Sequence, residues 1–187
     1  MKLVVLAGGL ATLFSLIGTP LLINLLRKRG IAQAIRESTE QVNYPEHGGK
    51  RGTPSMGGVA IVGSVVLAYF LAHLILMQPI THSGILTIYL MISLGLVGVA
   101  DDYLKIFKQR STGIRARTKL LGQAVAALSF GILATMFPDE GGNTPASNAV
   151  SWVRDTDWTL PSVGLLLWVW FLVTGITNGV NLTDGLD

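Results

Sequence analysis

Two adjacent carboxylates, Asp101 and Asp102, end a long apolar segment and precede Lys105 by about one helical turn. If this segment crosses a membrane, its carboxylates are energetically costly and are expected to be functional. Neighbouring residues on a helix point about 100° apart, so the two side chains are expected to have different roles. The alternative is structural pairing with Lys105 or Lys108 at the membrane interface.

A second polar group closes the chain, where polar side chains recur at every third position. Its members are Asn178, Asn181, Asp184 and Asp187. On a helix, consecutive members would share a face, while the first and last would point apart. Their amide and carboxylate groups could bind a base, a ribose or a hydrated metal ion. The alternative is a polar helix end in which asparagine acts only as a cap.

Two further segments have the composition of phosphate sites. Residues 50–58 read KRGTPSMGG, with cations followed by hydroxyls and glycines, and residues 105–119 contain six basic side chains. We expect Thr53 to be an N-cap and Pro54 to occupy the first turn of a helix, whose N-terminus would attract phosphate. The alternatives are an ordinary capped helix and basic charge that serves only membrane orientation.

Apolar segments long enough to cross a membrane must position these groups. Half of the 187 residues are hydrophobic and only 13% are charged. A hydrocarbon core about 30 Å thick needs roughly 20 apolar residues per helix. We therefore predict an all-α integral membrane protein, a single membrane domain over residues 1–187. Its five expected spans cover residues 3–26, 55–77, 85–106, 120–137 and 160–180.

Basic residues predict the orientation of these spans. Loops 27–53 and 105–119 contain twelve of the 14 Lys and Arg residues. The positive-inside rule therefore places both loops in the cytoplasm and the N-terminus outside. Segment 138–159 is then an external loop, in which we expect a short hairpin, and the C-terminal polar group is cytoplasmic. Basic residues beside apolar spans favour anionic lipid and phosphate as partners, not nucleic acid.

Four segments together resemble a known family. They are KRGTPSMGG (50–58), GVADDYLKIFK (98–108), ARTKLLGQ (116–123) and NGVNLTDGLD (178–187). In order and topology they resemble the phospho-N-acetylmuramoyl-pentapeptide transferases, within the superfamily of polyprenyl-phosphate N-acetylhexosamine-1-phosphate transferases. The first and last segments favour this branch over its N-acetylglucosamine-transferring relatives.

The resemblance implies an enzyme of the bacterial inner membrane, with its active face in the cytoplasm. Such an enzyme moves phospho-MurNAc-pentapeptide from UDP to undecaprenyl phosphate, giving lipid I and UMP for peptidoglycan synthesis. It uses Mg²⁺ and is often a homodimer. The resemblance implies catalytic or metal-binding roles for Asp101, Asp102 and Asp184, without deciding which of them binds Mg²⁺. It implies substrate binding by Lys50, Thr53, Lys119, Asn181 and Asp187.

The sequence also departs from the family. Ser55 stands where Thr is usual, and residues 35–47 lack the Asp-Gly-Pro that usually precedes a histidine in this loop. Members of the family that it resembles have about ten spans, so the chain resembles the N-terminal half of such a fold, and we expect it to be inactive alone. Alternative functions are N-acetylglucosamine-1-phosphate transfer, an ion-coupled transporter subunit and a non-catalytic membrane protein.

Overall fold

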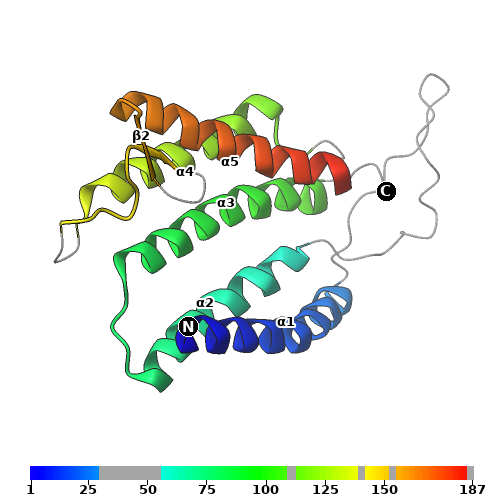
Figure 1. Ribbon diagram of the computed structural model, residues 1–187. Coiled ribbons are helices and arrows are strands. Elements are labelled where there is room, and N and C mark those ends of the chain that lie inside the picture. Colours follow the sequence, from blue (N-terminus) through cyan, green and yellow to red (C-terminus); the bar gives the residue numbers. More distant parts are fainter. Residues whose placement is uncertain (30–55, 109–112, 139–141, 152–154, 185–187) are drawn as a thin grey trace. The chain divides into compact units, whose positions relative to one another are not determined.

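The computed structural model describes residues 1–29, 56–108, 113–138, 142–151 and 155–184. Five long helices and one short hairpin make up this part of the chain (Figure 1). The helices are α1 (Lys2–Lys28), α2 (Gly57–Leu76), α3 (His82–Phe107), α4 (Ala116–Met136) and α5 (Ser162–Asp184). The hairpin pairs β1 (Ala149–Ser151) with β2 (Asp155–Thr159) in antiparallel fashion.

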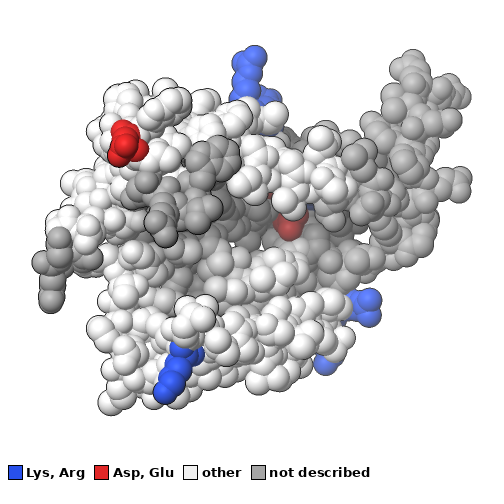
Figure 2. Space-filling model, viewed as in Figure 1, with Lys and Arg blue, Asp and Glu red and all other residues white. Residues whose placement is uncertain are grey.

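All five helices are long and apolar enough to cross a membrane. A helix satisfies its backbone hydrogen bonds internally, and this is what an apolar environment requires of a spanning segment. The viewed face of the described residues is largely uncharged, with isolated charged side chains (Figure 2). The helices lie over the five apolar segments expected from the sequence, although α4 begins at Ala116 and α5 extends to Asp184.

The start of α2 differs from the sequence prediction. The helix begins at Gly57, and its N-cap is Met56 in a left-handed conformation with φ 77°. Thr53 is therefore not the N-cap, and both Thr53 and Pro54 lie outside the described residues. At this start the Met56 backbone N–H donates to the Asp102 carboxylate at 3.1 Å, so a side chain distant in sequence satisfies a backbone donor there.

Helix packing groups the chain into two compact units, and the single membrane domain expected from the sequence stays a prediction. The first comprises Met1–Pro79 and Gly95–Arg115, so it includes the second half of α3. In this unit α1 lies beside α2 (Figure 1). Ser64, Ala68 and Ala72 form a buried stripe along α2, and a Cβ added to Gly18 on α1 would lie 3.8 Å from Ser64 Oγ. Small residues of this kind allow close approach of membrane helices.

The second unit comprises Ile80–Leu94 and Ala116–Asp187, with α4 packed against α5. The buried residues of α4 are Gln123, Ala126, Ala127, Gly131 and Ala134. They recur at helical spacing and form one face, here called the α4 seam. A Cβ added to Gly131 would approach Leu166 Cδ2 to 2.8 Å, so α5 lies directly on this seam.

We predict that enlarging a seam residue will loosen the α4–α5 pair. Ala127 is 0% exposed, so Ala127→Leu should overpack the seam and lower stability by about 1–3 kcal/mol. Val125, two positions away, is 61% exposed, and Val125→Leu should be nearly neutral. Thermal unfolding of both variants in the same detergent checks this, and equal midpoints would contradict the packing.

Candidate functional site

Asp101 is a buried carboxylate whose two oxygens both have partners. It is 9% exposed. Oδ2 lies 2.7 Å from Lys105 Nζ, one helical turn along α3, and Oδ1 accepts a hydrogen bond from the Ile114 backbone N–H at 2.8 Å. The pairing with Lys105 that the sequence left as an alternative is therefore present for Asp101. This carboxylate connects the end of α3 to the chain that enters α4.

Gly113 makes this connection possible. Its φ of 63° is a conformation that L side chains rarely adopt. A Cβ at this position would collide with the Asp101 carboxylate and approach Lys105 Cε to 2.9 Å. Glycine is therefore required both by backbone conformation and by the close approach of the buried carboxylate.

Asp102 has a different environment. It is partly exposed, and its Oδ2 accepts the hydrogen bond from Met56 N–H at the start of α2. A carboxylate is stabilised at a helix N-terminus by the unpaired N–H groups and the positive end of the helix dipole. As the sequence suggested, the two adjacent carboxylates have distinct surroundings. Met56, the residue that Asp102 contacts, belongs to the segment 50–58 singled out in the sequence.

The second unit contains other predicted site residues. Lys119 is partly buried in the first turn of α4, Asn181 is exposed near the end of α5, and Asp184 is the last residue of α5. Two turns of α5 before Asp184, Asn178 Nδ2 donates to Gln123 Oε1 at 2.9 Å. The sequence analysis expects these residues of the second unit to meet Asp101 and Asp102 of the first, and this stays a prediction.

The remaining predicted site residues, Lys50, Thr53 and Asp187, lie outside the described residues, as does the side chain of Asp184. Within the described part of the chain, no group of three or more His, Cys, Asp or Glu side chains is placed to hold a metal ion. Mg²⁺ often retains waters and uses only one or two carboxylates together with substrate phosphates. The Asp102 carboxylate is partly exposed and has the oxygen atoms that Mg²⁺ takes as ligands, so it fits such a role.

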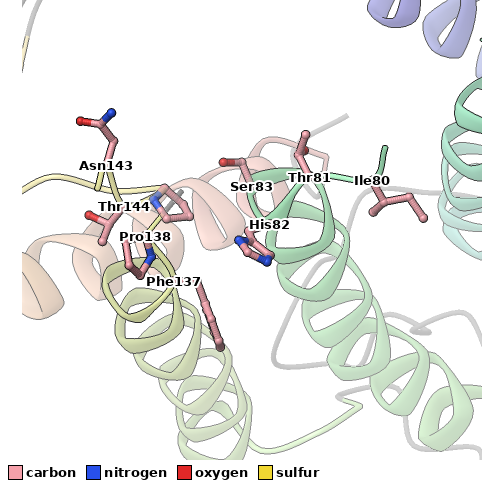
Figure 3. A pocket seen from close by; sticks show the side chains of 9 residues that line it. Ile80, Thr81, His82, Ser83, Phe137, Pro138, Asn143 and Thr144 are labelled. Carbon is pink, nitrogen blue, oxygen red and sulfur yellow. The ribbon is translucent and has the colours of Figure 1, made fainter. Parts of the chain in front are cut away.

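The second unit also has an open cleft of about 530 Å³ where α3 starts and α4 ends (Figure 3). The ring of His82 lies 5.7 Å from that of Phe137 across this region. Its lining residues are Ile80, Thr81, His82, Ser83, Phe137, Pro138, Asn143, Thr144 and Pro145. Of the predicted site residues whose side chains the structure describes, none lines this cleft, which lies at the opposite end of α4 from Lys119.

Five apolar helices, with a carboxylate pair near the end of one, define a multi-pass membrane protein. The sequence profile of glycosyl transferase family 4 matches residues 84–187, more than half of the chain, and the chain belongs to this family. Residues 50–62 match signature 1 of the phospho-N-acetylmuramoyl-pentapeptide-transferases. Met56, whose N–H binds Asp102, lies within that signature.

Curated phospho-N-acetylmuramoyl-pentapeptide-transferases resemble the chain along its length. Those of Streptomyces avermitilis, Frankia alni and Kocuria rhizophila are 45%, 46% and 48% identical to it. The alignments cover 100%, 100% and 97% of this chain, and 51%, 52% and 50% of the three relatives. The chain thus spans about half the length of the curated relatives it matches.

Sequence reasoning assigned no role to Gly113 or Gln123. The signal for Gln123 was an amide within the predicted span 120–137. Its partner Asn178 lies 55 positions away, so no local pattern joins them. For Gly113 there was no local signal beyond its place in a basic loop.

We predict that Gly113→Ala will disrupt the Asp101 connection. The positive φ alone should cost about 1–2 kcal/mol for alanine. The Cβ collision should break the Ile114 hydrogen bond and remove about 1–3 kcal/mol more. Gly142→Ala is the matched control, because Gly142 also has positive φ but open space at its Cβ. The measurement is the thermal unfolding of both variants. Equal losses of stability would show that the collision does not occur.

Proposed function

We propose that the protein transfers phospho-MurNAc-pentapeptide from its UDP conjugate to undecaprenyl phosphate, yielding lipid I and UMP for peptidoglycan synthesis. The observation that carries this proposal is the hydrogen bond from Met56 to Asp102. It joins the carboxylate pair to the segment that matches the muramoyl transferase signature. Membership of glycosyl transferase family 4 and the identities of 45–48% to the three relatives support the same reaction.

The reaction needs a nucleophilic phosphate and a leaving nucleotide. An oxygen of undecaprenyl phosphate attacks the sugar-bound phosphorus of the UDP conjugate. A new P–O–P bond forms as the bond to the uridine-bearing phosphate breaks, and UMP leaves. A phosphate monoester has a second pKa of about 6, so it is largely ionised at neutral pH and needs no strong base. The protein's main tasks are then to orient two phosphates and to offset their repulsion.

We assign these tasks to the residues that the sequence singled out, some of which lie outside the described part of the chain. Asp102 orients the lipid phosphate or accepts its remaining proton, while Asp101 holds the chain around Gly113 in place. Lys119 supplies positive charge, and Asn181 and Asp184 contact the nucleotide. Lys50, Thr53 and Asp187 complete the substrate contacts. In the competing route an aspartate attacks first and forms a phospho-sugar adduct, and detection of such an adduct on the protein would refute direct attack by the lipid phosphate.

Mg²⁺ is part of this proposal. Of the three carboxylates that the sequence suggested for the metal, Asp102 has the surroundings that best fit a ligand, and Asp184 is the second candidate. When bound, the ion would neutralise charge on the phosphates. Asp101 already uses both oxygens within the protein, so we assign it the structural part.

We place the enzyme in the bacterial inner membrane with this chemistry on the cytoplasmic face. Twelve of the 14 basic residues lie in loops 27–53 and 105–119, which supports that orientation. A lipid phosphate at the inner leaflet and a soluble nucleotide substrate could both reach helix ends on this side.

We predict that Asp102→Asn will abolish transfer. The chain is assayed in membranes in place of the segment that it matches in the Streptomyces avermitilis relative, where we expect transfer. The chain alone, which we expect to be inactive, is assayed beside it. Release of UMP and formation of the lipid product are measured with UDP-MurNAc-pentapeptide, and UDP-GlcNAc tests the sibling reaction. Loss of a proton acceptor or orienting group should reduce the rate by about 10²–10⁴-fold. The same change at exposed Asp157 is the control.

Near-normal transfer by Asp102→Asn would remove this residue from the site. Transfer from UDP-GlcNAc in preference to UDP-MurNAc-pentapeptide would refute the proposed substrate. The relative that carries this chain in place of its own segment should transfer. If it does not, while the unchanged relative is active under the same conditions, the reaction is refuted for this chain.

A second prediction concerns orientation. The chain has no cysteine, so single cysteines can be labelled without background. In intact cells, a membrane-impermeant maleimide should label Ser147→Cys in the external loop, and should label Ser111→Cys only after permeabilisation. The reversed pattern would contradict the proposed orientation.

A further inference from the structure

A reciprocal pair of amides joins α4 to α5 within the second unit. Asn178 Nδ2 donates to Gln123 Oε1 at 2.9 Å, and Gln123 Nε2 lies 3.5 Å from Asn178 Oδ1. Asn178 Nδ2 also donates to the Thr174 carbonyl at 2.8 Å, which fixes the orientation of its side chain. Gln123 is 1% exposed, so its amide depends on Asn178 rather than on solvent.

Gln123 is chemically distinct from the rest of the α4 seam, whose other members are alanines and a glycine. An apolar side chain would satisfy the packing of such a seam. A buried amide is costly unless its partner stands at one particular place, so paired amides select one alignment of two helices over neighbouring alignments. Sliding α5 by one residue would separate this pair, whereas contacts among small apolar residues would change little.

The alignment that the pair selects has a consequence for two predicted substrate ligands. α4 and α5 are antiparallel, because the Gly131–Leu166 contact lies later on α4 and earlier on α5 than the amide pair. Lys119 is one turn before Gln123 on the same face of α4, and Asn181 is three residues after Asn178 on α5. The pair therefore brings the end of α4 that carries Lys119 to the end of α5 that carries Asn181.

We propose that Gln123 and Asn178 are positioning residues that fix the register of α4 on α5, so that Lys119 and Asn181 act on the same substrate. The assignment of Lys119 and Asn181 to the substrate rests on the proposed transferase function. The register itself is a property of the helix pair and can be measured without activity.

Cross-linking of the cysteine-free chain tests the register directly. Lys119→Cys is combined in turn with Asn181→Cys, Gly179→Cys and Thr183→Cys in the full chain in membranes. A bismaleimide with a reach of about 8–10 Å matches the separation of packed helix axes. We expect the Asn181 combination to dominate. Adding Gln123→Leu should abolish that dominance, and exchanging the amides as Gln123→Asn with Asn178→Gln should restore it.

Two controls separate a shifted register from general unfolding. Ser129→Ala removes another hydrogen bond of this unit, between Ser129 Oγ and Tyr89 Oη at 2.7 Å, and should leave the cross-linking pattern unchanged. Ala134→Cys with Leu166→Cys, near the far end of the seam, should still cross-link in Gln123→Leu if the helices remain packed.

The link to substrate is tested in a chimera, in which the chain replaces its matching segment of the Streptomyces avermitilis relative. The quantity measured is kcat/KM of transfer. Gln123→Leu should lower kcat/KM by about a hundredfold, as a displacement near 1 Å can, and the exchanged pair should recover most of it. Ser129→Ala should keep the parent value.

Persistence of the Asn181 cross-link in Gln123→Leu would overturn the register proposal. A lost register with unchanged kcat/KM would overturn the positioning role. If the parent shows no transfer, the proposed function fails while the cross-linking still decides whether the amide pair sets the register.

Discussion

The ion pair between Asp101 and Lys105 is the interaction on which the arrangement of the carboxylates depends. A buried carboxylate must be paired and hydrogen-bonded to remain charged, and Asp101 obtains both from Lys105 and Ile114. The neighbouring Asp102 points about 100° away on the helix and is the carboxylate that reaches the start of α2. Two identical side chains thus have different partners because of their positions on one helix.

Much of this arrangement could be predicted from the sequence. Uninterrupted apolar segments gave five helices because a chain in an apolar environment must satisfy its own backbone groups. The angular difference between Asp101 and Asp102 followed from helix geometry alone. The start of α2 did not follow, because local propensity favoured Thr53 as a cap. The helix instead has Met56 as its N-cap, whose N–H donates to Asp102, 46 positions away.

Polar contacts between helices were the least predictable part of the candidate site. Gln123 gave a signal, since an amide in an apolar segment needs a partner, but sequence alone could not identify Asn178 among the polar residues of α5. Gly113 gave a still weaker sequence signal. Glycine is required there because the Asp101 carboxylate packs against its backbone. Such features depend on tertiary contacts, whereas the spans depend on composition over a window of residues.

The reciprocal amides also bear on how the chain is made. While α4 and α5 are apart in lipid, Gln123 and Asn178 have no water to replace each other's hydrogen bonds, and pairing in such surroundings is favoured by about 1–2 kcal/mol. The two helices follow each other along the chain, joined by the segment that contains the hairpin. Once α5 has been inserted beside α4, the amides favour their lateral association as a helical hairpin. Biogenesis would then deliver the Lys119 and Asn181 ends already aligned, ahead of any substrate.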